Sequence, residues 1–422
     1  IAGSTLAALP GGGFALLLVG RSLQGLGLAL SALIMATARD NLSELRLPSA
    51  IALLAVSTTV GVGLSYPITS LLDDLAGVHA PFWFGTVVAS IALLLCWGVV
   101  PASAKRDRRP LDVGGAALIG AALLALLIAV TEAHSWSWTS VQVIALLLAS
   151  AALGWLWVVR ERSTSQPLFE LKLLANRTVA MTFLTSMIFS LTVYMFVPIV
   201  SDFVQIPRSE GYGFGASVFV AGLMLVPFSA LSGTVAPIAT RISRRVGPSR
   251  LILVAGLVVA SGLLMFAATE EALWEAFVAM AIVGLGFGNS VAVMPGLIVA
   301  SVPPEETGSA LGFMSVTSFI GLAFGSAIGA SILGAYTKAG QLLPGRTGFT
   351  VALIVGAGCS IAAALVATQI RQGSAVEASG RAGDEAAVGS VALATIVEPS
   401  LVTPPTGPMI QTHDWVAGRP DP

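Results

Sequence analysis

The chain has 422 residues, of which 55% are hydrophobic and 10% are charged, and its formal net charge is −1. A mean hydropathy of +0.89 leaves too little charge to cover a water-soluble surface. The basic residues are dispersed and the chain is nearly neutral, so it lacks the basic patch that binds nucleic acid. The composition therefore predicts an all-α integral membrane protein whose solvent is a lipid bilayer.

The first residues, from Ile1 onward, are already apolar and lack the basic segment and cleavage site of a signal peptide. Residues 1–9 look like the end of a membrane span. We therefore expect the chain to be a fragment whose beginning is missing.

Runs of roughly 20 mostly apolar residues are long enough to cross the hydrocarbon core as helices. After the partial span, such runs predict eleven complete spans, at residues 14–35, 49–71, 82–100, 112–130, 139–159, 178–201, 215–238, 251–268, 275–299, 309–335 and 348–369. Residues 372–422 have no sustained apolar face, and we expect them to form a disordered tail.

Lysine and arginine gather in alternate loops, as they do on the cytoplasmic side of membrane proteins. The basic loops hold Arg39, Arg46, Lys105, Arg106, Arg108, Arg109, Arg160, Arg162, Lys172, Arg177, Arg241, Arg244, Arg245 and Arg250, whereas the opposite loops hold Arg208, Lys338 and Arg346. This pattern predicts a multi-pass protein of the cell membrane with a cytoplasmic C-terminus. The preference for arginine over lysine and the abundance of alanine and glycine hint at a bacterial source.

Arg21 lies inside the first complete span, where an arginine costs roughly 2.5–3.5 kcal/mol on insertion scales. Gln24 lies one turn away on the same face, and Gly25 and Ala29 form a small pair suited to close helix packing. One interpretation is an arginine that reaches out of the membrane over a tightly packed helix. The other is a functional arginine, whose cost in the membrane neighbouring groups must compensate.

The pattern Arg21-x-x-Gln24-Gly25-x-Gly27-x-Ala29 resembles the fourth-helix motif of the major facilitator superfamily, in particular of its 14-span drug:proton antiporters. The resemblance implies two six-helix halves and two inserted helices, with a proton-coupling role for Arg21 and Gln24. It divides the chain into the remainder of the first half (1–100, with the first two helices missing), the inserted pair (101–165), the second half (166–371) and the tail (372–422).

The same resemblance implies gating residues. Asp40, at the end of the motif helix, matches an acid that bridges to a cytoplasmic gating loop, although an ordinary solvated charge is an equal alternative. Gly61, Gly63 and Pro67 match part of the glycine-rich antiporter motif of the next helix. The flanking glycines of that motif are replaced here by Tyr66, Ser70 and Leu71.

In the second half, the segment from Pro237 to Arg250 occupies the place of a second gating loop. Arg244 replaces the acid that the family often has there, and Arg245 follows it. Glu305 and Glu306, two spans later, are candidates to pair with these arginines when the inner gate closes.

We expect the substrate cavity to lie between the halves near the midplane. Its candidate lining residues are Phe183, Tyr194, Asn289, Met294 and Phe313, although side chains at such spacing are more often packing or lipid-facing residues. The predicted spans have no carboxylate at mid-depth. The proton carrier must then lie at a span end, as Asp73, Asp74, Glu132 and Asp202 do, or on the missing helices, which we favour.

The predicted function is proton-coupled export of small hydrophobic or amphipathic compounds such as drugs, by alternating access. A carrier that imports or equilibrates one metabolite would share the fold and stays an alternative. An enzyme is the weakest alternative, because His79, His134 and His413 fall in separate segments and no metal-spaced ligand set occurs. The sequence has no ATP-binding loop and predicts no cofactor. The expected partners are the substrate, protons and lipid; a monomer is expected, although the sequence does not define the oligomeric state.

Overall fold

The computed structural model describes residues 1–370 apart from residues 12, 28–29, 31–33, 35–36, 38–40, 42, 44–46, 101–111, 165–170, 304–305, 339–340 and 342. All of these residues belong to one compact unit, Ile1–Val376. Its helices are α1 (Ala2–Ala8), α2 (Gly13–Leu26), α4 (Leu47–Ala76), α5 (Ala80–Val99), α6 (Val113–Trp136), α7 (Val141–Ser163), α8 (Arg177–Gln205), α9 (Val218–Leu223), α10 (Leu225–Val246), α11 (Pro248–Thr269), α12 (Leu273–Val299), α13 (Thr307–Ala335) and α14 (Arg346–Ala367), with short 3-10 helices η2 (Leu171–Ala175) and η3 (Arg208–Glu210). The predicted tail lies outside the described residues.

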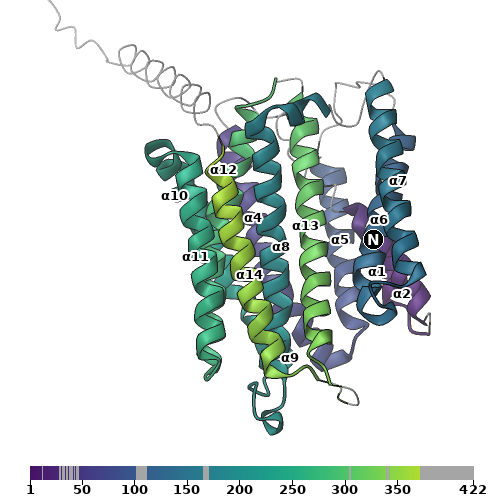
Figure 1. The fold of residues 1–422 in the computed structure, drawn as a ribbon, viewed down its shortest axis with the longest axis vertical. Coiled ribbons are helices and arrows are strands. Elements are labelled where there is room, and N and C mark those ends of the chain that lie inside the picture. The colour runs from purple at the N-terminus through teal and green to yellow at the C-terminus, as the bar shows by residue number, and fades with distance from the viewer. Residues whose placement is uncertain are drawn as a thin grey trace, which may run out of the picture. The chain divides into compact units, whose positions relative to one another are not determined.

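Long apolar helices dominate this part of the chain (Figure 1). Within the described residues, nine helical segments are long and apolar enough to cross a membrane, and they coincide with the nine predicted spans between residues 82 and 369. A helix is the natural solution there, because it satisfies its backbone hydrogen bonds without water. The all-α membrane fold is thus confirmed. Of the two earlier predicted spans, 49–71 falls in α4, which has 30 residues, and 14–35 begins with α2.

Several helices end later than their apolar runs do. Helix α4 continues to Ala76, so Asp73 and Asp74 lie in its last turns and not in a loop. Helix α10 continues to Val246, so most of the expected gating loop is helical. The chain turns only at Gly247, whose φ of 92° favours glycine, and α11 starts at Pro248. Hydropathy marks where hydrocarbon ends, and a helix can continue beyond that point into the interface.

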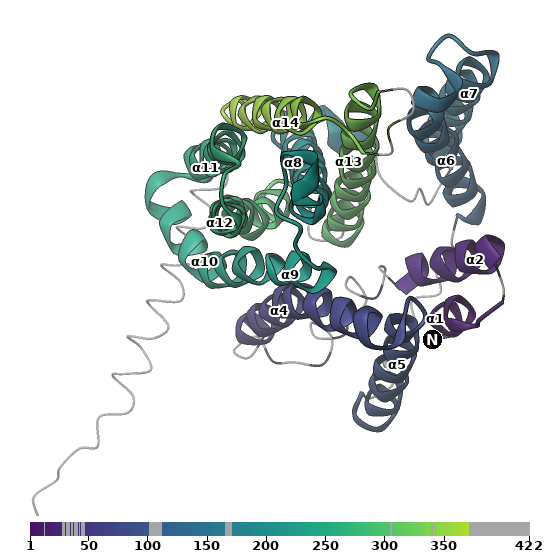
Figure 2. The ribbon, with the colours of Figure 1, turned by 90° about the horizontal axis from the view of Figure 1, so that it is seen from below.

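The second half of the chain, α8 to α14, packs around α8 and α12 (Figure 2). Helix α8 contacts α12, α13 and α14, and α12 contacts α10 and α11. The tightest approach lies between α8 and α13, where a Cβ atom on Gly321 would overlap the carbonyl oxygen of Met187 and one on Gly325 would overlap that of Leu191. Glycines spaced four residues apart therefore let the two backbones touch, as small residues do in membrane helix pairs.

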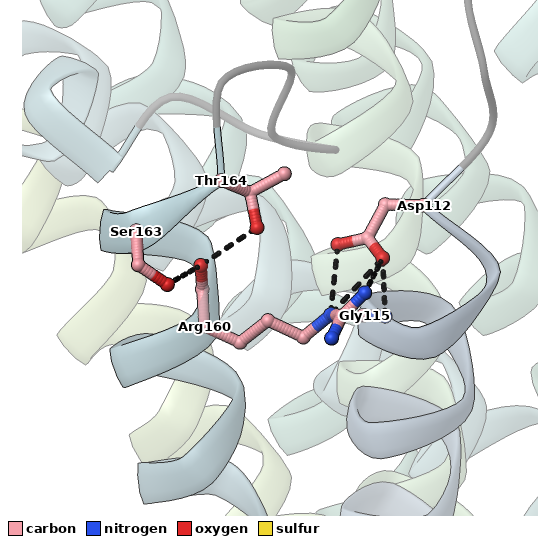
Figure 3. Close-up of polar contacts among 5 residues, drawn as sticks. All are labelled: Asp112, Gly115, Arg160, Ser163 and Thr164. Atoms are coloured by element: carbon pink, nitrogen blue, oxygen red, sulfur yellow. Dashed lines mark hydrogen bonds and ion pairs between the residues drawn. The ribbon is translucent and has the colours of Figure 1, made fainter.

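Helices α6 and α7 form a hairpin that packs against α13. An ion pair joins the two helices at one end (Figure 3). Arg160 on α7 donates from Nη2 to Asp112 Oδ1 over 2.7 Å and from Nε to the same oxygen over 3.1 Å. Asp112 also caps α6, because its Oδ1 accepts the backbone N–H of Gly115 over 2.9 Å. One carboxylate thus starts α6 and fastens α7 to it.

We expect this ion pair to stabilise the hairpin in a pH-dependent way. The hydrogen bond from Arg160, followed by that from Gly115, holds the pKa of Asp112 below its ordinary value of 3.8. A carboxyl whose pKa falls on folding contributes stability that is complete above its unfolded pKa and is lost as the pH falls through its folded pKa. Asp112→Asn should therefore lower the thermal unfolding temperature at pH 7, and the difference from wild type should narrow as the pH falls below about 4.

Thermal unfolding of the purified protein between about pH 3 and pH 7 measures this difference. Arg160→Ala should behave like Asp112→Asn, whereas Arg162→Ala, on the exposed side of the same turn, should match wild type. If the difference in unfolding temperature between Asp112→Asn and wild type stays constant down to the lowest pH, the stabilising role of the ion pair between Asp112 and Arg160 is contradicted.

Candidate functional site

A cavity of about 570 Å³ lies among the helices of the first half. This volume is within the range of small-molecule sites, roughly 300–1,000 Å³. Its lining residues come from α1, α2, α4, the turn after α4, α5 and the start of α9, and they are Ser4, Arg21, Gln24, Ser65, Tyr66, Thr69, Ser70, Asp73, Val78, Pro81, Phe82, Gly85 and Val218. The wall therefore combines hydroxyl and amide groups with apolar side chains and two opposite charges.

Arg21 is held against the wall of this cavity by two neighbours. Its Nη1 donates a hydrogen bond to Gln24 Oε1 over 3.3 Å, and its guanidinium carbon lies 5.0 Å from the centre of the Phe82 ring. A cation over an aromatic face at this distance is attracted by the negative face of the ring. Arg21 thus lines the cavity, and its proton-coupling role stays a prediction.

Gln24 connects Arg21 to α1 through a second hydrogen bond. Its Nε2 donates to Ser4 Oγ over 2.9 Å, so Arg21, Gln24 and Ser4 form one chain of polar contacts. The close helix contact beside it does not involve Gly25, around which a Cβ would meet nothing within 4 Å. It is made by Gly20, where a Cβ would lie 2.7 Å from the Gly3 carbonyl oxygen. Ala29 lies outside the described residues, so the packing pair expected of Gly25 and Ala29 stays a prediction.

Helix α4 connects the cavity to the second half, because it packs against α9 and α10. A Cβ on Gly63 would lie 2.5 Å from the Cβ of Ser229, and one on Gly222 would lie 2.6 Å from the Oγ of Ser70. Gly61 faces open space instead. Pro67 is buried within the helix and does not end it. Of the predicted glycines, Gly63 alone lies at a close contact.

The five residues predicted to line a central cavity lie elsewhere. Phe183 is buried, and its ring centroid lies 5.3 Å from that of Phe313 in a packed cluster of α8, α12 and α13. Met294 is buried in the main core, against which Tyr194 packs. Asn289 donates from Nδ2 to the Leu285 carbonyl of its own helix over 2.8 Å. None of the five lines the cavity that holds Arg21, and their substrate contacts stay a prediction.

The predicted gating charges are only partly described. Asp40 and Glu305 lie outside the described residues, as does the side chain of Arg244. Arg245 is exposed in the last turn of α10, and Glu306 is half-buried at the start of α13. The pairing of these arginines and glutamates stays a prediction.

Asp73 is one of the four acids that the sequence places at the ends of predicted spans. The structure places it in the same cavity as Arg21 and Gln24. The available signal was its spacing from Tyr66 and Thr69, because residues i, i+3 and i+7 share a helix face. That signal needs the helix to continue past residue 71, which hydropathy does not indicate. In the part of the chain that the structure describes, no three metal-ligating side chains come together.

A bundle of apolar helices around a charged cavity of this size defines a multi-pass membrane protein with a site for a small molecule. The sequence profile of the Major Facilitator Superfamily matches residues 1–116 and 178–406. The chain belongs to this superfamily, which implies a membrane transporter rather than an enzyme. The unmatched segment between the two ranges contains nearly all of α6 and α7.

Several bacterial relatives are named for resistance. The chain is 31% identical over 339 residues to the multidrug resistance protein Stp of Mycobacterium tuberculosis, covering 77% of this chain and 60% of that protein. It is 25% identical over 356 residues to the quinolone resistance protein NorB of Staphylococcus aureus, covering 82% of this chain and 74% of that protein. The chain thus spans about 60% of the length of Stp.

Among solved structures, an auto-inhibited POT family peptide transporter is similar in fold. The TM-score is 0.54 at 15% sequence identity, covering 87% of this chain and 80% of that chain. At this identity the likeness concerns the fold alone.

Proposed function

We propose that this protein is a proton-coupled exporter of small hydrophobic or amphipathic compounds, including drugs, and that it works by alternating access. The observation that carries the proposal is the cavity in which Arg21 and Gln24 lie together. It offers a charged, partly aromatic wall to a small molecule. The resistance names of Stp and NorB supply the substrate class, and Arg21 and Gln24 are the proposed proton-coupling pair.

We further propose the 14-span arrangement, in which α6 and α7 are added between two six-helix halves. The break in the family match at this hairpin supports it. In this arrangement the basic helix ends face the cytoplasm of a bacterial cell, as does the C-terminus, and the protein is a monomer in the cell membrane.

The proposed gate uses the contact between α4 and α10. Gly63 permits the close approach to Ser229, and Pro67 removes one backbone hydrogen bond from α4, so this helix can bend near the cavity. Gly61 and Asp40 are further proposed gate residues. Arg244 and Arg245 would latch the cytoplasmic side by pairing with Glu305 and Glu306, a contact that matters only where water is partly excluded.

Efflux of a fluorescent lipophilic cation from pump-deficient cells tests the proposal. Cells that express the full-length protein should expel the dye faster than vector controls, and a protonophore should stop the difference. The protein must be verified in the membrane in both conditions. Absence of efflux would contradict drug export and favour a carrier for one metabolite; efflux that survives the protonophore would contradict proton coupling.

A further inference from the structure

The last turns of α10 lie beyond the apolar part of that helix. The segment suited to the hydrocarbon core ends at Val235, whereas α10 continues to Val246. The added residues 236–246 extend the helix by about 16 Å at about 1.5 Å per residue. Figure 2 shows α10 at the edge of the bundle, where it packs mainly against α4 and α12. Within the added turns Ala239 is fully buried, so one face is covered by protein, and the opposite face is exposed.

The exposed face of these turns is amphipathic. Ile238, Ile242 and Val246 are spaced four residues apart and are exposed by 52%, 40% and 45%. Arg241 and Arg245, which are also spaced four residues apart, are exposed beside them. Residues at i, i+3 and i+4 are neighbours on a helix surface, so the apolar and the cationic side chains form two adjacent stripes. Such a face suits the boundary between the acyl chains and the headgroups of a bilayer.

The positive charge of this surface is not neutralised by the helices around it. Neither Arg241 nor Arg245 makes a hydrogen bond or ion pair with any residue that the structure describes. Arg250, in the first turn of α11, is also exposed and has no such partner in the described part of the chain. Helices α10 and α11 carry no acid, and the acids of α4 and α12 lie at the opposite ends of those helices. The three arginines are therefore left for an anion from outside the protein.

We propose that the amphipathic end of α10, together with Arg250, binds the headgroups of anionic phospholipids. Guanidinium groups donate hydrogen bonds in a planar arrangement that matches phosphate oxygens, and the apolar stripe beside them packs against acyl chains. The stripe would have no role in binding free phosphate, so a lipid is the occupant that uses both halves of the face. This inference goes beyond the proposed export function and does not depend on what is exported. Arg245 is also a proposed latch residue, whereas Arg241 and Arg250 are not.

Titration of the delipidated full-length protein with phosphatidylglycerol, followed by native mass spectrometry, tests this inference without transport. Wild type should bind phosphatidylglycerol more tightly than phosphatidylcholine, which has no net charge. Arg241→Gln/Arg250→Gln should bind phosphatidylglycerol about tenfold more weakly or worse, because each basic residue at an anionic surface contributes about fivefold, or about 1 kcal/mol. Its affinity for phosphatidylcholine should not change. The matched control, Arg208→Gln/Lys338→Gln, removes two exposed charges at the opposite end of the bundle and should stay within about twofold of wild type.

Wild-type affinity of Arg241→Gln/Arg250→Gln for phosphatidylglycerol would overturn the proposal. Equal weakening by the two double variants would show a general effect of charge and would overturn the assignment of the site.

The position of the apolar stripe can be measured independently. A nitroxide attached at Val246→Cys, in a protein whose free cysteines Cys96 and Cys359 are replaced by serine, reports on its surroundings in vesicles of phosphatidylcholine and phosphatidylglycerol. We expect the nitroxide to be more accessible to oxygen, which concentrates among acyl chains, than to a water-soluble nickel complex. Greater access for the nickel complex would overturn the lipid assignment and would favour a protein partner for this face.

Discussion

Replacing Arg21 with alanine should abolish proton-driven transport while leaving the protein in the membrane. The guanidinium is the one positive charge of the cavity lining. It forms a hydrogen bond with Gln24 and a cation–π contact with Phe82, and both of these residues line the same cavity. The hydrogen bond and the cation–π contact are each worth about 1 kcal/mol, and each 1.4 kcal/mol corresponds to a tenfold change in an equilibrium. We therefore expect at least a tenfold loss of the efflux rate.

The measurement is dye efflux into a medium of imposed pH, with the amount of membrane-inserted protein determined for each variant. Arg21→Lys should keep part of the activity, because lysine retains the charge but not the planar group that lies over Phe82. Ser22→Ala is a matched control, since the Ser22 hydroxyl donates only to Leu18 of its own helix. Normal pumping by Arg21→Ala would remove Arg21 from the mechanism.

Valine in place of Gly325 should prevent stable folding of the second half. A Cβ at this position would overlap the carbonyl oxygen of Leu191 on α8, and this atom belongs to a helix backbone that cannot rotate aside. Overpacking of a well-packed interior typically costs about 1–3 kcal/mol, and a clash with backbone lies at the upper end of that range or beyond it. We expect little monodisperse protein after extraction, and a clearly lower unfolding temperature in what remains.

Size-exclusion chromatography and thermal unfolding of the extracted protein provide the measurement. Gly312→Val is the matched control on the same helix, because a Cβ there would meet nothing within 4 Å. Both variants replace glycine with valine in the same helix, so the change in intrinsic helix propensity is the same and cannot explain a difference in stability between them. Equal stability of Gly325→Val and Gly312→Val would refute the close contact between α8 and α13.

The fold was predictable where a single property decides it. From residue 82 to 369, apolar runs bounded by charges coincide with helices, because crossing hydrocarbon leaves the backbone no alternative. Helix ends were less predictable. Arg241 and Arg245 continue α10 although they are charged, since a helix needs only its hydrogen bonds and not a lipid environment.

The site was predictable along one helix and not between helices. Arg21 and Gln24 are three residues apart, and local spacing sufficed to place them on one face. Asp73 reaches their cavity only because α4 and α2 adopt particular rotations about their axes, and no local pattern encodes those rotations. The same limit explains why Phe183 and Met294, aromatic and thioether side chains suited to a ligand, lie in packed clusters instead.

The late end of α10 has a mechanical consequence. Ser229, at the contact with α4, and Arg245 are on one uninterrupted helix, and the distance between them along its axis is about 24 Å at about 1.5 Å per residue. If α10 pivots at Ser229 by about 10°, its arginine-bearing end moves by about 4 Å, which exceeds the length of a hydrogen bond, about 3 Å. A small rotation of α10 can therefore leave its packing against Gly63 intact. At the far end of the same helix, that rotation gives a displacement large enough to make or break a contact of Arg245.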